Sequence, residues 1–377
     1  MHLTLHLTRA CNMRCKYCYA PPQACAPMAL STIRQAINMG LANNSGSCGV
    51  VFFGGEPLLH RDLIREAVAY GQSLQVARKG RLHYKVTTNG LLLDEAFLSF
   101  AVRNEVIIAM SFDGIQAAHD AHRVLPDGRG SYSLALPKLK MLLDVKPYSS
   151  VIMVVNPDTA CHLSDSVSFL LDIGARYVVC ALNYSGDWNE GSLAALKGQY
   201  RKLAKMYVTW TKAGRKFYFS PFEVKIASHI HMDRCNELRC DLGARQHSVD
   251  PEGYVYPCVQ FPKAGPQSQW CIGNVRDGVD PKAYQRIRQM SARPKEPCRT
   301  CALERRCLET CACLNWQTTG SIDQISPVLC AHERMITPIA DALAQKLYDQ
   351  RDPLFVQKHY NDYYPLLSLL EDQLSGA

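Results

Sequence analysis

The sequence predicts an α/β protein that begins as an open partial (β/α)6 barrel, continues as a cysteine-rich region with little regular structure, and ends in a short helical cap. Up to about residue 214, short β-branched runs alternate with helical patterns, which is typical of parallel strands joined by crossover helices. Beyond that point cysteine, glycine and proline interrupt the chain, until helical periodicity returns at Ala331. The expected divisions are therefore residues 1–214, 215–330 and 331–377.

Six strand and helix units can be placed in the first division, too few for the eight of a closed barrel, and a doubly wound sheet is the alternative arrangement. The predicted strands cover residues 3–7, 49–53, 82–87, 106–111, 151–155 and 177–182. The predicted helices cover residues 30–41, 62–76, 94–102, 133–143, 164–171 and 194–213.

Composition excludes several classes of protein. The 377 residues, 47% of them hydrophobic, can bury a large core without disulfide bonds. The 17 cysteines therefore do not indicate a small disulfide-rich scaffold. We find no signal peptide and no apolar stretch of membrane-spanning length, and so expect a cytoplasmic protein without membrane contact. The net charge of +8 is scattered, which favours ordinary solvated surface over a nucleic-acid partner.

Three cysteines, Cys11, Cys15 and Cys18, directly follow the first predicted strand with gaps of three and two residues. Three thiolates can hold three irons of a 4Fe-4S cube and leave the fourth iron open to a ligand. A structural zinc site needs four ligands, and the spacing of nearby Cys25 fits no common zinc pattern. The triplet therefore favours an iron-sulfur cluster over zinc or unrelated buried thiols.

This triplet resembles the signature of the radical S-adenosylmethionine (SAM) superfamily, whose fold is a partial TIM-like barrel. The run Gly54-Gly55-Glu56-Pro57 looks like that family's glycine-rich motif, whose exposed backbone meets the methionine amino group of SAM. Ser111 and Asp113 end the fourth strand, on the face where barrel sites assemble. The resemblance implies that Ser111 contacts polar groups of SAM and that Tyr17 lies beside the adenine. The segment 88–90 ends the third strand on the same face, but taken by itself it predicts a plain strand-end turn.

The resemblance also implies a chemistry. One electron from the cluster cleaves SAM to methionine and a 5'-deoxyadenosyl radical, which abstracts hydrogen from an unactivated carbon. That chemistry belongs to the cofactor, while the protein orients the reactants and excludes water and oxygen. An external reductant such as flavodoxin or ferredoxin would supply the electron.

A second set of cysteines begins at Cys240, which is followed after twelve residues by Gly253 and after four more by Cys258. Four further cysteines have gaps of two, five and three residues, and one more closes the set: Cys298, Cys301, Cys307, Cys311 and Cys330. This order resembles the seven-cysteine motif of the SPASM domain, a C-terminal module of radical enzymes that modify peptides.

In the full SPASM module eight thiolates hold two auxiliary 4Fe-4S clusters, and Cys235 lies where the extra upstream ligand belongs. The resemblance implies that Cys235, Cys240, Cys258 and Cys311 hold the first auxiliary cluster, and Cys298, Cys301, Cys307 and Cys330 the second. The chain would then carry three 4Fe-4S clusters and SAM. By spacing alone, the four cysteines from 298 to 311 also fit a zinc site.

Six cysteines are left over: Cys25, Cys48, Cys161, Cys180, Cys271 and Cys313. Cys48 and Cys180 lie beside or within apolar strands and are read as core residues. Cys271 and Cys313 are the two that can replace a neighbour in the ligand set.

The preferred function is a crosslink or related modification of a ribosomally synthesised precursor peptide. The alternatives are maturation of a folded protein, such as a sulfatase or quinoprotein, and, from another class, a non-catalytic iron-sulfur electron-transfer protein or a zinc-binding protein. Sulfatase-maturing relatives carry an aspartate base directly after the cysteine that matches Cys258, but this chain has Val259, which cannot accept a proton.

Because the triplet begins at residue 11, we expect no N-terminal domain that grips a leader peptide. Leader binding would then fall to a separate protein, the C-terminal helices or a sheet edge. The substrate-site candidates lie at or beyond the ends of the fifth and sixth strands, where barrel loops carry function. They are Asn156, Asn183, Tyr184 and Asp187.

Overall fold

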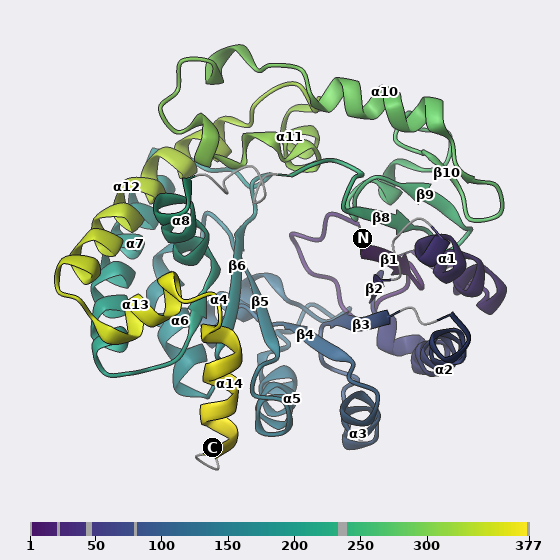
Figure 1. Ribbon diagram of the computed structural model, residues 1–377, viewed down its shortest axis with the longest axis horizontal. Helices are drawn as coiled ribbons and strands as arrows, with labels where there is room; N and C mark the ends of the chain where they lie inside the picture. The colour runs from purple at the N-terminus through teal and green to yellow at the C-terminus, as the bar shows by residue number, and fades with distance from the viewer. Residues whose placement is uncertain (1, 21–22, 43–46, 79–80, 233–239, 375–377) are drawn as a thin grey trace.

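The structure, a computed structural model, describes residues 2–20, 23–42, 47–78, 81–232 and 240–374. Its parallel strands curve into an open ring with helices on the outside (Figure 1). The neighbouring strands are β1 (His2–His6), β2 (Ser47–Phe53), β3 (Arg81–Thr88), β4 (Ile107–Ser111), β5 (Ser150–Val155), β6 (Tyr177–Leu182) and the short β7 (Tyr218–Phe219). The predicted α/β class with a partial parallel barrel is confirmed.

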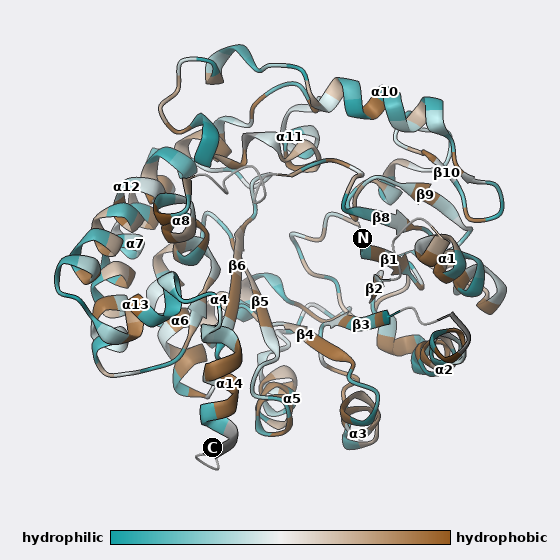
Figure 2. Cartoon of the chain, in the orientation of Figure 1, coloured by the Kyte–Doolittle hydropathy of each residue, from teal (hydrophilic) through white to brown (hydrophobic). Residues whose placement is uncertain are grey.

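The outer helices owe their positions to apolar faces and side-chain caps. They are α1 (Leu30–Ala42), α2 (Arg61–Arg78), α3 (Glu95–Arg103), α5 (Tyr132–Val145), α6 (Leu163–Asp172) and α7 (Glu190–Lys212). Helix α1 buries Ile33, Ala36 and Ile37, the spacing of one helical face. Asp94 caps α3, and an Asn189–Ser192 capping box begins α7. Hydrophobic residues run along β4, β5 and β6, so the core lies between sheet and helices (Figure 2).

The cysteine-rich region continues the same sheet. β8 (Gln246–Val249) runs parallel to β1 on the side opposite β2, and β9 (Tyr254–Tyr256), β10 (Gly273–Asn274) and β11 (Gly278–Val279) follow antiparallel. Helices α10 (Pro281–Ser291) and α11 (Ala312–Thr319) lie across the open side of the ring (Figure 1). This region is more regular than predicted, because strands of two to four residues are too short to show a period in the sequence.

Two helices of the ring were not predicted, α4 (Gln116–His122) and α8 (Ser220–Ile230). The C-terminal cap consists of α12 (Pro327–Asp349), α13 (Pro353–Tyr360) and α14 (Tyr364–Leu374). Helix α12 begins earlier than the predicted Ala331, because Ser326 caps it and Pro327 suits its first turn. None of the described helices is both long and apolar enough to cross a membrane.

Helix α12 is fixed to the ring by buried polar contacts. It packs against α7 and α8. Lys225 of α8 forms a buried ion pair of 2.5 Å with Glu333 of α12. His332, also buried, is hydrogen-bonded by the hydroxyls of Tyr184 and Tyr200 at 3.0 and 2.9 Å. The cap is therefore docked by specific pairing as well as by apolar burial.

Candidate active site

The loop after β1 carries the first three cysteines, and its backbone is hydrogen-bonded to the last residue of α4 and to the segment that follows it. The Arg14 amide donates to the Val124 carbonyl at 2.8 Å, and the Lys16 amide donates to the His122 carbonyl at 2.9 Å. The thiols of Cys11, Cys15 and Cys18 are half-buried. Burial raises the pKa of Cys15 to about 11, so iron binding at neutral pH must displace a proton there.

The glycine motif after β2 lies directly against the backbone of the cysteine loop. The Gly55 amide donates to the Thr8 carbonyl at 2.8 Å. A Cβ on Gly55 would come within 2.1 Å of the Ala10 carbonyl oxygen, and one on Gly54, whose φ is +128°, within 2.3 Å of the Thr8 carbonyl oxygen. The expected reason for glycine at these positions is that its exposed backbone meets SAM. The structure gives a second reason, since the loop after β1 leaves no space for a side chain.

Glu56 of the same motif is fully buried and holds the end of β3. Its carboxylate accepts hydrogen bonds from the Leu58 amide, the Thr88 hydroxyl and the Asn89 amide at 3.0, 2.7 and 2.7 Å. Burial raises its pKa. Asn89 in turn donates to the Asn12 side chain at 2.8 Å, beside the first cysteine. Segment 88–90 is thus more than the predicted turn, and the one signal in the sequence was its place at a strand end.

Asp113 and Tyr17 tie the cysteine loop to the end of β4. The Tyr17 hydroxyl donates to Asp113 at 2.7 Å and accepts from the Arg123 guanidinium at 2.8 Å. Asp113 also accepts from the Val154 amide at 3.0 Å. Asp113 and Arg123 are buried, and Ser111 is half-buried at the last position of β4. Arg123 was not among the predicted residues, because it lies in an irregular segment without a motif.

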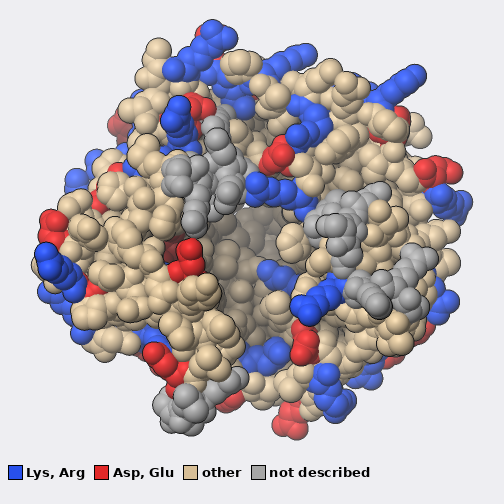
Figure 3. Space-filling model, viewed as in Figure 1, with Lys and Arg blue, Asp and Glu red and all other residues tan. Residues whose placement is uncertain are grey.

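A pocket of ≈ 460 Å³ opens between the cysteine loop and the ends of β5 and β6. Tyr17, Asn156, Asn183 and Asp187 line it. Asn183 donates to the Asn156 side-chain oxygen at 2.9 Å. The Asn156 amide nitrogen is buried and has no hydrogen-bond partner in the described part of the chain, so a residue of the pocket wall holds an unused donor. The centre of the ring is hollow, with lysine and arginine side chains on its border (Figure 3).

Tyr184, the fourth predicted substrate residue, is not brought to this pocket. Its hydroxyl bonds His332 of α12, so it lies at the contact between ring and cap. Its neighbours in the sequence, Asn183 and Asp187, do line the pocket. A place at a strand end does not tell which of these residues reaches the pocket, because the side chains of neighbouring loop residues point in different directions.

The second cysteine set comes from several short segments around α11. Cys240, Cys258 and Cys311 precede β8, follow β9 and precede α11, and a hydrogen bond joins the thiols of Cys240 and Cys311. Gln246 donates to the sulfur of Cys258 at 3.2 Å. Cys235 lies outside the described residues. Cys298, Cys301, Cys307 and Cys330 are half-buried in the segments from residue 296 to the first turn of α12.

Within the described ranges, no group of three or more histidines, cysteines and carboxylates has the arrangement that holds a single metal ion. The spare thiols differ in environment: Cys48 is buried in the core, Cys161 is exposed, and Cys25 accepts from the Arg9 amide at 3.1 Å.

Side chains from the first cysteine loop contact the second cysteine region. Arg9 forms a bidentate pair with Glu252 at 2.6 and 2.5 Å. Half-buried Tyr19, next to Cys18, donates to the Val259 carbonyl at 3.3 Å. The two sets of thiols are therefore parts of one site region.

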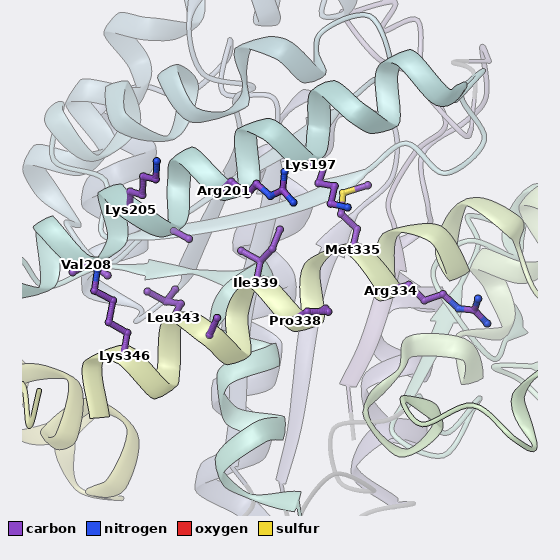
Figure 4. A pocket seen from close by; sticks show the side chains of 12 residues that line it. Lys197, Arg201, Lys205, Val208, Arg334, Met335, Pro338, Ile339, Leu343 and Lys346 are labelled. Atoms are coloured by element: carbon purple, nitrogen blue, oxygen red, sulfur yellow. The ribbon is translucent and has the colours of Figure 1, made fainter. Parts of the chain in front are cut away.

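A separate groove of ≈ 540 Å³ lies between the outer helices α7 and α12 (Figure 4). Its floor is apolar, with Met335, Ile339 and Leu343 from α12. Its rim is basic, with Lys197, Arg201 and Lys205 from α7 and Arg334 and Lys346 from α12. This groove lies outside the ring, so it is not part of the cysteine site.

An open β/α barrel with thiols and buried charged groups at the carboxyl ends of its strands has the architecture of a barrel enzyme, because barrel enzymes carry their active sites at that end. The radical SAM superfamily matches residues 5–170, and SPASM, an iron-sulfur cluster-binding domain, matches residues 240–302. The chain belongs to the radical SAM superfamily and is a radical SAM enzyme with a SPASM domain.

Its relatives act on sulfatases and peptides. The cysteine-type anaerobic sulfatase-maturating enzyme of Clostridium novyi is 24% identical over 66% of this chain and 70% of its own length. The PqqA peptide cyclase of Gluconobacter oxydans is 24% identical over 94% of this chain and 95% of its own length. The solved structure of native anSMEcpe with bound AdoMet and Cp18Cys peptide has a TM-score of 0.78 at 18% identity, covering 92% of this chain and 99% of that chain, which shows the shared fold.

Radical SAM and SPASM membership implies SAM and iron-sulfur clusters, and the residues of this chain fit both. Three thiols on one anchored loop suit a cluster with an open iron. Asn156 lines the pocket beside that loop, and its unpaired amide nitrogen is a spare donor that suits a polar ligand. When bound, cluster and SAM together supply a carbon-centred radical. Membership of an enzyme family excludes the alternatives of a non-catalytic electron-transfer protein and of a zinc-binding protein.

Proposed function

We propose that this enzyme is a maturase of a ribosomally synthesised peptide, in which it installs a crosslink or a related modification. The observation that carries the proposal is Val259. Sulfatase-maturing relatives carry an aspartate base directly after the matching cysteine, and the isopropyl group of Val259 cannot accept a proton. Sulfatase maturation would therefore need another base in this chain. The full-length similarity to a peptide cyclase supports the same choice.

The chain's own residues have distinct parts in this proposal. Cys11, Cys15 and Cys18 hold the cluster that binds SAM, and Asp113 with Arg123 keeps their loop in place. Tyr17 and Asn156 contact SAM from the pocket wall. We assign the exposed carboxylate of Asp187 as proton acceptor, because the other carboxylate of the pocket, Asp158, is already paired with His122 at 2.8 Å.

The SPASM thiols complete the proposal with two auxiliary clusters, so that the loaded enzyme carries three. The ligands of both auxiliary clusters are cysteines of residues 215–330, and Cys330 is the last of them. An acidic electron carrier of the flavodoxin or ferredoxin type is the proposed reductant.

The precursor's leader is proposed to bind in the groove between α7 and α12. Five cationic side chains surround an apolar floor there, and none of them forms an ion pair with another described residue. The groove therefore suits an acidic segment with apolar residues on one face. This arrangement favours the C-terminal helices over a sheet edge as the leader site. Exchanging Arg201 and Lys205 for glutamate should raise KM for the precursor and leave kcat unchanged, because the groove is remote from the chemistry.

The decisive experiment is mass spectrometry of precursor peptides encoded beside this protein, each coexpressed with it. A mass loss of hydrogen in one precursor, absent with the Cys15→Ala variant, is the expected result. Purified enzyme would also be incubated with cysteine-type and serine-type sulfatase peptides. Conversion of either to formylglycine, with no neighbouring precursor modified, would establish the second candidate, maturation of a folded protein.

A further inference from the structure

We propose that Cys313 is a ligand of the first auxiliary cluster, together with Cys240, Cys258 and Cys311. The inference deepens the proposed function, since it rests on the SPASM clusters. It differs from the set implied by the sequence, which takes Cys235 and leaves Cys313 spare.

The four thiols are joined in an unbroken series of contacts. The sulfur atoms of Cys311 and Cys313 lie 3.6 Å apart. The thiol of Cys311 is hydrogen-bonded to that of Cys240, and the thiol of Cys313 to that of Cys258. Three separate segments therefore deliver four sulfur atoms to one place.

Local structure explains why Cys313 takes part. Cys311 is the residue before α11, and Cys313 lies in the first turn of that helix. Cys258 and Cys313 are 3% and 6% exposed, so both thiols face the interior. Cys271, the other spare candidate, lies elsewhere: its thiol donates to the Gly273 carbonyl at 3.5 Å.

The surroundings suit a cluster. Phe261, Trp270 and Trp316 form an aromatic group beside α11, with ring centroids 4.9 to 5.8 Å apart. An apolar shell of this kind limits solvent access and shifts the potential of a cluster. Gln246 donates to the sulfur of Cys258 at 3.2 Å, the kind of contact that tunes a thiolate ligand. Four thiolates are what a complete 4Fe-4S cluster takes.

The test uses the full chain with Cys11, Cys15 and Cys18 replaced by alanine, so that only auxiliary clusters remain. In this background Cys313→Ala, Cys313→Ser, Cys235→Ala and the control Cys271→Ala are reconstituted anaerobically. Iron and sulfide are counted, and the reduced clusters are examined by electron paramagnetic resonance and redox titration.

We expect about eight irons in the background and in Cys271→Ala. Cys313→Ala should lose up to half of them, or show a three-iron signal. Cys313→Ser should keep iron with a shifted midpoint potential, because an oxygen ligand has replaced sulfur, which a packing role would not produce.

Unchanged iron, spectrum and potential in both Cys313 variants would overturn the inference and leave the proposed function standing. A background protein that binds no iron would overturn the auxiliary clusters themselves, and with them both proposals.

Discussion

The hydroxyl of Tyr17 donates a hydrogen bond of 2.7 Å to the buried carboxylate of Asp113, across 96 residues of sequence. Tyr17 lies between two cysteines of the triplet, and Asp113 lies two residues beyond the end of β4. Arg123 also donates to Tyr17, so a buried carboxylate and a buried guanidinium together hold the loop that carries the triplet.

Replacing Asp113 by asparagine should destabilise the protein by about 3 kcal/mol, because the guanidinium of Arg123 would stay buried without a nearby negative charge. Urea unfolding of the purified protein measures the loss. Asp127→Asn is the control, since Asp127 pairs with Arg129 on the surface. Equal stability of the two variants would show that the buried charges are not coupled.

Gly55→Ala should reduce cluster content and stability, because its methyl group would come within 2.1 Å of the Ala10 carbonyl oxygen. Iron analysis and thermal unfolding provide the two readouts. Gly198→Ala is the matched control: this glycine lies inside α7 with open space around it, and alanine should stabilise that helix by about 1 kcal/mol. Normal iron content in Gly55→Ala would contradict the close approach of the two loops.

Cys15→Ala should abolish formation of 5'-deoxyadenosine from SAM and lower the iron content from about twelve to about eight per chain. Anaerobic reconstitution with dithionite and SAM tests both effects. Cys161→Ala, which removes an exposed spare thiol, should change neither. Full SAM cleavage by the Cys15 variant would disprove the proposed role of the triplet.

His332→Gln should weaken the dependence of stability on acid pH. Burial, with the nearby charge of Lys225, lowers the pKa of His332 to about 3. Below pH 6.5 His332 binds a proton in the unfolded chain but stays neutral in the folded chain. The free energy of unfolding therefore falls as the pH drops from 6.5 towards 3, by up to about 1.4 kcal/mol per pH unit.

The groups around His332 are the hydroxyls of Tyr184 and Tyr200 and the ion pair of Lys225 with Glu333. Unfolding free energies at pH 7, 6 and 5 measure the slope, with His83→Gln, an exposed histidine, as control. If the parent protein and His332→Gln lose stability in parallel on acidification, His332 is not the group responsible.

The sequence by itself determined the class of fold and the family. Strands such as 49–53 and helices such as 30–41 follow from local periodicity. The spacing of Cys11, Cys15 and Cys18 is likewise a local pattern, which can be recognised without a structure.

The tertiary structure alone decided which distant groups meet. Arg123 joins the site through Tyr17, and Thr88 and Asn89 join it through Glu56. Tyr184 was predicted at the substrate site from its place beyond a strand end, but its hydroxyl bonds His332 instead. A place at a strand end does not tell which partner a side chain meets. The pairing of β8 with β1 and the gathering of Cys313 with Cys258 likewise depend on how the chain returns to its beginning. Periodicity and spacing describe neighbours along the chain, whereas burial and hydrogen bonding at this site join residues that are tens to hundreds of positions apart.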